Sequence, residues 1–94
     1  MRLTQKEINS IKSTFEDVFN EGTIYLFGSR VDDSKKGGDI DLYISTKTKD
    51  DLVKKKIDFL VSLKRKIGQQ KIDVVLDFGQ NRLIDKIAKE GIRL

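Results

Sequence analysis

Two aspartates separated by one residue are the chemically most informative feature of this 94-residue sequence. Asp39 and Asp41 lie in an apolar stretch that is typical of a β-strand, in which residues i and i+2 share a face. Their backbones would then be roughly 6.6 Å apart, and the carboxylates could converge on a pair of divalent cations about 3.5–4 Å apart. Oxygen ligands of this kind suit Mg²⁺ or Mn²⁺, and a bound cation would relieve the repulsion between the two charges.

A Gly-Ser-Arg turn that precedes this pair could bind phosphate. An apolar run typical of a strand ends at Gly28-Ser29. Glycine lets the backbone approach a ligand closely, and serine is a favoured N-cap residue of a helix. Such a turn presents free backbone N–H groups, and Arg30 adds positive charge. In the simpler alternative, Ser29 only caps a helix and Arg30 pairs with Asp32 or Asp33.

A third carboxylate follows in the later, mainly apolar run Lys71–Phe78, which predicts a third strand. Asp73 and Asp77 share one face of this strand, since side chains alternate. Adjacent strands lie about 4.8 Å apart, so Asp73 could join Asp39 and Asp41 if it occupies the same face of the sheet.

Three helices are predicted around these strands. The first begins at the capping box Thr4–Glu7 and ends near residues 20–22. The last is opened by Gln80 or Asn81 and ended by Gly91, with four apolar residues facing inward: Leu83, Ile84, Ile87 and Ala88. The order helix-strand-strand-helix-strand-helix predicts one α+β domain over residues 1–94, with a small mixed sheet and helices packed on one face.

The middle helix, predicted over residues 49–67, has an unusually wide apolar arc. Thr48 or Asp50 would open it, and Gly68 would end it. Its apolar residues, from Leu52 to Ile67, cover roughly 200° of the helix, whereas a helix resting on one sheet needs only about 100°. Contact with both the sheet and the first helix would explain the width. A surface that also receives another chain, whether a partner or a second copy of this one, is the alternative.

Composition limits the chemistry further. The sequence has no cysteine and no histidine, which excludes disulfides, thiolate or histidine metal sites and histidine-based nucleophilic triads. No signal peptide and no membrane-spanning stretch is recognisable, so a cytoplasmic protein without membrane contact is expected. The net charge of +4 permits a nucleotide or RNA as partner. The lysine clusters of the middle helix alternate with acidic residues and have no stacking aromatics, which favours a solvated face over an RNA site.

The combined pattern resembles a known family. Gly28-Ser29, the loop of residues 30–38 and Asp39-x-Asp41 are similar to the signature of the DNA polymerase β-like nucleotidyltransferases. The chain is most similar to the minimal nucleotidyltransferases, the antitoxin-type partners of HEPN-domain proteins. Those domains also have a helix before the first strand, a third carboxylate on a later strand, and a terminal helix ending near Glu-Gly-aliphatic. Asp73 and the segment Glu90–Leu94 match the last two features, so the resemblance covers the whole chain.

Three departures from the family pattern concern the loop. It is one residue shorter than expected, and Gly38 stands where a serine often precedes the first aspartate. Val31-Asp32-Asp33 replaces an Arg-Gly that is often found there.

The resemblance implies transfer of a nucleoside monophosphate, with ATP as the donor, onto a hydroxyl group of a partner. The expected acceptor is a tyrosine of a HEPN-type toxin, which would make this protein the antitoxin of the pair. Two Mg²⁺ ions, replaceable by Mn²⁺, would assist, and the implied metal ligands and catalytic residues are Asp39, Asp41 and Asp73. The implied phosphate-binding residues are Gly28, Ser29 and Arg30. The family places its acid early in the third strand, which selects Asp73 over Asp77.

Two other functions are also compatible with the sequence. A catalytically silent module could keep the fold and neutralise a partner by contact, or a small basic protein could bind RNA without any chemistry. For Tyr43, on the face of the aspartates, stacking on a base competes with ordinary half-burial in a strand.

Overall fold

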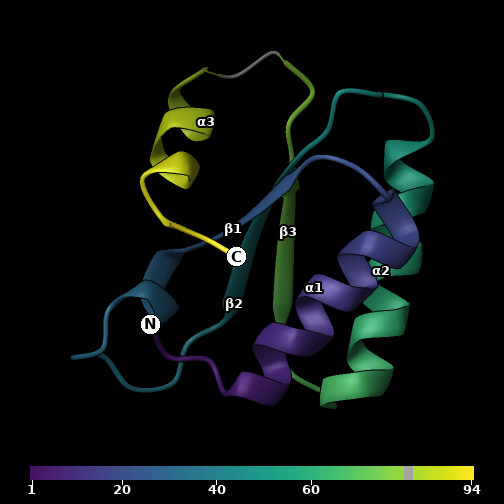
Figure 1. Ribbon diagram of the computed structural model, residues 1–94. Coiled ribbons are helices and arrows are strands. Elements are labelled where there is room, and N and C mark those ends of the chain that lie inside the picture. Colours follow the sequence, from purple (N-terminus) through teal and green to yellow (C-terminus); the bar gives the residue numbers. More distant parts are fainter. Residues whose placement is uncertain (80–81) are drawn as a thin grey trace.

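The computed structural model describes residues 1–79 and 82–94, and its sheet lies between two helices on one side and a third on the other (Figure 1). The elements in chain order are α1 (Gln5–Phe19), β1 (Thr23–Phe27), the short 3₁₀ helix η1 (Gly28–Val31), β2 (Ile40–Ser45), α2 (Leu52–Ile67), β3 (Ile72–Leu76), α3 (Arg82–Lys89) and β4 (Ile92–Arg93). None of the helices described is long and apolar enough to cross a membrane.

The sheet is mixed, as predicted. Its strand order is β3-β2-β1-β4, with β2 parallel to β3 and β1 antiparallel to both of its neighbours. A parallel pair requires a crossover connection, and α2 provides it between β2 and β3. The α+β class is therefore confirmed.

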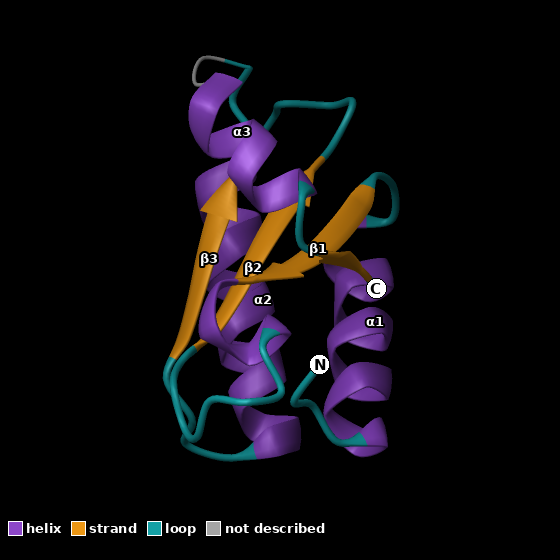
Figure 2. Cartoon of the chain, turned by 90° about the vertical axis from the view of Figure 1, so that its left-hand side faces the viewer, coloured by secondary structure: helices purple, strands orange, loops and turns teal. Residues whose placement is uncertain are grey.

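The arrangement of the helices corrects one detail of the prediction. α1 and α2 share a face of the sheet, whereas α3 lies across the opposite face (Figure 2). The physical reason is space: the chain leaves β3 at one edge of the sheet and must return to β4 beside β1. The first face is already filled by α1 and α2, so the return crosses the other one.

Side chains alternate along the strands, so the apolar core lies on one face of the sheet and the aspartates lie on the other. The residues of one face pack against apolar side chains of α1 and α2 in a single cluster, whose strand members are Ile24, Leu26, Ile40, Leu42, Ile44, Ile72 and Val74. The side chains between them, including Asp41 and Asp73, must point to the opposite face. There Tyr43 is completely buried, beneath the side of the sheet that α3 crosses. Stacking of Tyr43 on a base is thereby excluded in this conformation.

The helix boundaries follow the sequence signals at α1 better than elsewhere. Thr4 and Glu7 form both hydrogen bonds of the predicted capping box. α2 begins at Leu52, later than expected, because Asp51 precedes it in a left-handed conformation with φ 56°. Gly68 ends α2 as predicted.

The C-terminal segment differs most from the prediction. Ala88 is buried, but Ile84 and Ile87 are exposed, and the side chain of Leu83 lies outside the described part. Gln80 and Asn81, the predicted start of α3, also lie outside the described residues. After the helix, the chain forms β4, a strand that the sequence did not predict, and Gly91 approaches β1 so closely that a Cβ atom there would lie 2.1 Å from the Leu26 carbonyl oxygen.

Candidate active site

The parallel pairing of β2 with β3 brings the predicted carboxylates together. Asp41 is the direct register partner of Asp73, on the face of the sheet opposite the core. Asp39 immediately precedes β2, and the Nζ atom of Lys71 lies 3.4 Å from its Oδ2 atom. Since Ile40 pairs with Ile72, Asp39 and Lys71 are neighbours across the same two strands. The three aspartates therefore share one face, as the alternation of the two strands predicts.

The electrostatics of this cluster favour a cation. Burial, followed by the charges of Asp73 and Asp39, raises the pKa of Asp41 above its usual value, against a smaller opposing effect of Lys71. Among the side chains that the structure describes, no group of three or more acidic residues is arranged to hold a metal ion by itself. Mg²⁺, however, is commonly bound by one or two carboxylates together with substrate phosphates and water. The oxygen donors and the unfavourable negative charge at Asp41 fit such a shared site.

The Gly-Ser turn closes directly onto these carboxylates. β1 ends at Phe27, the register partner of Asp41, and Gly28 follows with φ +76°. A Cβ atom at Gly28 would lie 2.2 Å from Oδ2 of Asp41, so only glycine fits without displacing that carboxylate. The backbone of the turn thus lies against the acidic cluster.

Gly38 fits the same turn from the other side of the loop. It has φ +91°, and a Cβ atom there would lie 2.2 Å from Oγ of Ser29. The serine often found at this position in the resembling family would collide with Ser29 in this conformation. The departure from the family pattern is therefore explained by how closely the loop packs on Ser29.

Comparison with known families agrees with this geometry. The family model described as polymerase beta, nucleotidyltransferase matches residues 9–94. The chain belongs to this nucleotidyltransferase family. No curated protein matches it. The match supports a transferase activity, nucleotidyl transfer, at the level of the superfamily.

Arg30 stabilises the loop of this nucleotidyltransferase domain through hydrogen bonds. Its guanidinium group donates hydrogen bonds to the carbonyl oxygens of Arg2 (2.9 Å) and Gly38 (3.1 Å) and to Oε1 of Gln70 (3.3 Å). No ion pair of Arg30 with Asp32 or Asp33 is found among the described residues. The partners of Arg30 give it a structural role, and its contact with phosphate stays a prediction.

Gln70 extends the same network to the start of α1. Its Nε2 atom donates to Oε2 of Glu7 at 2.7 Å. Burial alone would raise the pKa of Glu7, but hydrogen bonds from Thr4 and Gln70, together with the charge of Arg30, hold it below its usual value. The capping box of α1 is therefore connected to the Gly-Ser turn through Gln70 and Arg30.

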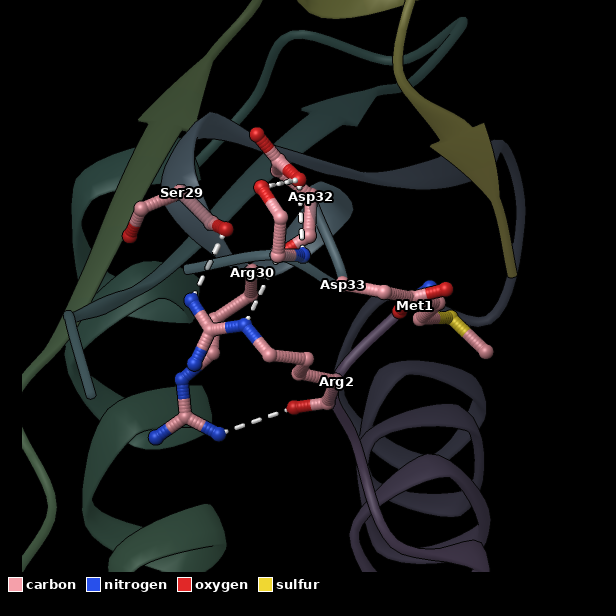
Figure 3. Close-up of polar contacts among 7 residues, drawn as sticks. Met1, Arg2, Ser29, Arg30, Asp32 and Asp33 are labelled. Carbon is pink, nitrogen blue, oxygen red and sulfur yellow. Dashed lines mark hydrogen bonds and ion pairs between the residues drawn. The ribbon is translucent and has the colours of Figure 1, made fainter. Parts of the chain in front are cut away.

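Arg2 is a site residue that the sequence analysis missed. It donates to three loop carbonyl oxygens, those of Asp32 (2.9 Å), Gly37 (2.6 Å) and Ser29 (2.8 Å), while the Ser29 hydroxyl points away from it (Figure 3). Its own backbone N–H donates to the Arg30 carbonyl oxygen at 2.7 Å. All four partners lie about thirty residues away in sequence, so no local pattern could have indicated this arrangement.

The acids that replace the family's Arg-Gly take part in the loop's own hydrogen bonds. Oδ1 of Asp32 accepts from the backbone N–H and the hydroxyl of Ser34, and these bonds lower the pKa of Asp32. Asp33 forms an ion pair with the Met1 amino group. Both acids are exposed, and their partners lie within the loop and at the N-terminus.

Asp77, the competing third acid, has a different environment. It accepts hydrogen bonds from the Ser45 hydroxyl (2.9 Å) and the Gly79 N–H (2.7 Å). Burial alone would raise its pKa, but these bonds, the charge of Lys49 and a hydrogen bond from Tyr43 keep the pKa below its usual value. Asp77 is thus held at the far end of β3, four residues beyond Asp73.

The contacts of Arg2 predict that its side chain keeps the loop of residues 29–37 ordered. In Arg2→Ala, three side-chain hydrogen bonds to the loop of residues 29–37 are lost, so hydrogen exchange of the loop amides should accelerate by about tenfold for each roughly 1.4 kcal/mol of local stability removed. Lys12→Ala, which removes a lysine from the exposed surface of α1, is the matched control. Exchange followed by mass spectrometry should change in the first variant only. Unchanged loop exchange in Arg2→Ala would contradict the assigned role.

The raised pKa of Asp41 predicts that the variant Asp41→Asn is more stable than the original protein, by an amount that depends on pH. Because the folded state favours the protonated acid, the stabilising contribution of Asp41 is present below its unfolded pKa and is lost as the pH rises through the folded value. Asp41→Asn should therefore raise the Tm at pH 7, by roughly 4–8 °C for about 1 kcal/mol relieved. The gain should vanish at pH values below 3.8, the ordinary pKa of the acid.

Thermal melts at several pH values measure this difference. Asp17→Asn, a substitution on the exposed side of α1, controls for the general effect of removing a negative charge from a protein of net charge +4. A pH-independent change in Asp41→Asn, or an equal change in both variants, would show that the crowding of the three aspartates has no effect on stability.

Proposed function

We propose that this protein is a Mg²⁺-dependent nucleotidyltransferase that moves AMP from ATP onto a hydroxyl group of a partner protein. The observation that carries the proposal is the register of Asp41 with Asp73 beside the Gly28-Ser29 turn, in a chain of the polymerase beta nucleotidyltransferase family. Mn²⁺ would be an acceptable substitute, because it also prefers oxygen ligands. The choice of ATP and of a protein acceptor comes from the resemblance to minimal nucleotidyltransferases.

The carboxylates have separate roles in the proposed reaction. Asp39 and Asp41 would hold the metal ions together with oxygens of the triphosphate. When bound, the ions would neutralise charge on the phosphates and lower the pKa of the acceptor hydroxyl. Asp73 would complete the site and accept the proton of that hydroxyl as its oxygen attacks the α-phosphorus. The bond from the α-phosphorus to the bridging oxygen breaks, and pyrophosphate leaves.

The turn would hold the leaving phosphates. Gly28 and Ser29 stand at the beginning of η1, next to Asp41, where backbone N–H groups can meet an anion. Arg30 would contribute positive charge near the same place, although its hydrogen bonds to Arg2, Gly38 and Gln70 suggest that it acts mainly by fixing the turn.

The proposed partner is a HEPN-domain toxin, with AMP placed on one of its tyrosines, so that this protein serves as the antitoxin. This step rests on the resemblance in the Gly28-Ser29, Asp39-x-Asp41 and Glu90-Gly91 segments. Transfer is therefore expected when a HEPN protein is supplied together with Mg-ATP, and mass spectrometry of that protein would detect the added AMP.

The metal assignment predicts a loss of nucleotide binding without unfolding. Asp39→Asn combined with Asp41→Asn should bring Mg-ATP binding below detection in calorimetry, because the carboxylates that hold the cation are gone. The stability of the double variant should be equal or higher, because two repelling charges are removed. Mg²⁺ together with ATP should raise the Tm of the original protein and leave that of the variant unchanged. Equal Mg-ATP affinity in both proteins would refute the metal assignment.

The assignment of Asp73 predicts a loss of transfer that Asp77 does not share. Asp73→Asn should slow transfer by about 10²–10⁴-fold, the usual contribution of a general base. Asp77→Asn should keep most of the activity, since the amide still offers an oxygen to Ser45 and Gly79. Nucleotide binding should survive better in Asp73→Asn than in the Asp39/Asp41 double variant. Equal losses of transfer at Asp73 and Asp77 would mean that the third acid is wrongly chosen.

A further inference from the structure

An exposed apolar stripe runs along α2. Val53, Ile57 and Val61 are four residues apart, so they lie one above the other on one side of the helix. Their exposed fractions are 62%, 57% and 47%, whereas Leu52, Phe59 and Leu63 of the same helix are buried in the core. This α2 stripe accounts for the excess width of the apolar arc, because contact with the sheet and α1 leaves it uncovered.

The neighbouring strand β3 has an open edge. It is the outermost strand of the sheet, with α2 behind it (Figure 2). The Ile40 N–H donates to the Lys71 carbonyl oxygen, and the Asp77 N–H donates to the Ile44 carbonyl oxygen. Residues 71, 73, 75 and 77 therefore direct their main-chain groups toward β2. The intervening residues, 72, 74 and 76, direct theirs away from the described sheet.

A groove joins the stripe to this edge. It has a volume of about 350 Å³ and is lined by Val53, Lys56, Val74, Val75, Leu76 and Phe78. Phe78 is half exposed at the end of β3. The α2 stripe, the groove and the open edge thus form one continuous surface. A strand edge bordered by apolar side chains is a favourable place for another strand to pair.

The charges of α2 indicate which molecule fits this surface. Asp50 and Asp51 stand just before the helix, Lys54, Lys55 and Lys56 and then Asp58 follow within it, and Lys64, Arg65 and Lys66 stand in its last turn. A second copy related by a two-fold axis presents the same helix in the opposite direction, so the acidic pair of one copy meets the basic last turn of the other, and Lys56 meets Asp58. The same axis supplies an antiparallel strand for the open edge. An unrelated partner would have to provide the apolar stripe, the strand and the charge order independently.

We infer that two copies of this chain associate through α2 and the edge of β3, forming one continuous sheet. Ile57 lies near the two-fold axis, Val53 faces Val61 of the second copy, and Lys64 faces Asp50 of the second copy. The inference goes beyond the proposed function and does not depend on it. The side chain of Asp73 projects from the sheet face opposite α2, so the α2 contact leaves the aspartate cluster open.

Sedimentation equilibrium tests the inference directly. At high micromolar concentration, the protein should sediment near twice the 10.8 kDa mass of one chain. Ile57→Asp should weaken association by at least about tenfold, because it places like charges on the axis. Ile87→Asp is the matched control: its exposed fraction is 56%, but it lies on α3, across the sheet. It should leave the mass unchanged.

The outcomes separate the occupants of the surface. A protein that stays at the mass of one chain up to its solubility limit would overturn the inference and leave the surface to a different partner. Association that survives Ile57→Asp, or that Ile87→Asp abolishes equally, would also overturn it. Circular dichroism of both variants ensures that a loss of association is not a loss of fold.

Cross-linking gives a second measurement on the folded protein. The sequence has no cysteine, so Ile57→Cys carries a single thiol. Mild oxidation should convert it rapidly into a covalent dimer, because the two thiols meet across the axis, whereas Ile87→Cys should react only slowly. Equal rates would overturn the arrangement. Lys64→Glu should weaken association, and the added change Asp50→Lys should restore it; failure of this rescue would overturn the antiparallel order of the helices.

Discussion

The register between β2 and β3 is the constraint on which the candidate site depends. It places Asp73 beside Asp41 and Lys71 beside Asp39. A slip of one residue would turn Asp73 toward the core and bring an apolar side chain to the opposite face. The register is held because Ile72 and Val74 fill the core beneath α2. Apolar packing on one side of the sheet therefore determines which charges meet on the other.

The loop between β1 and β2 shows a second constraint, which is steric. At Gly28 and at Gly38, a Cβ atom would lie 2.2 Å from Asp41 and Ser29, respectively. Both glycines also have positive φ, which disfavours any side chain there, and a Cβ atom would in addition require Asp41 or Ser29 to move. The hydrogen bonds of Arg2 and Arg30 then hold the closed loop in place, and those from Arg2 to Ser29 and Asp32 can be followed in Figure 3. The loop therefore packs directly against the aspartate cluster. A cation held by these aspartates could also bind an anion, and the backbone of the loop would lie close to that anion.

Those features that depend on local alternation could be predicted from the sequence. The capping box at Thr4, the two central strands and the shared face of Asp41 and Asp73 all follow from periods of a few residues. The two-residue strand β4 has no period to detect, and the face chosen by α3 depends on what already covers the sheet. The contacts of Arg2 depend on chain folding over about thirty residues. The roles of the site residues in chemistry remain predictions, because they require the ligand.

The strand β3 combines three separate tasks in five residues. Ile72 and Val74 pack in the core, Asp73 faces the candidate site, and the main-chain groups of residues 72, 74 and 76 form the open edge. An edge strand has neighbours on one side only, so the position of Asp73 relative to Asp41 depends on a single ladder of hydrogen bonds and on the core beneath it. Pairing of the open edge would add a second ladder and restrict the motion of Asp73, while a cation would remove the repulsion that drives it away from Asp41. Association and metal binding would thus both hold Asp73 of β3 beside Asp41, although they contact different sides of the strand.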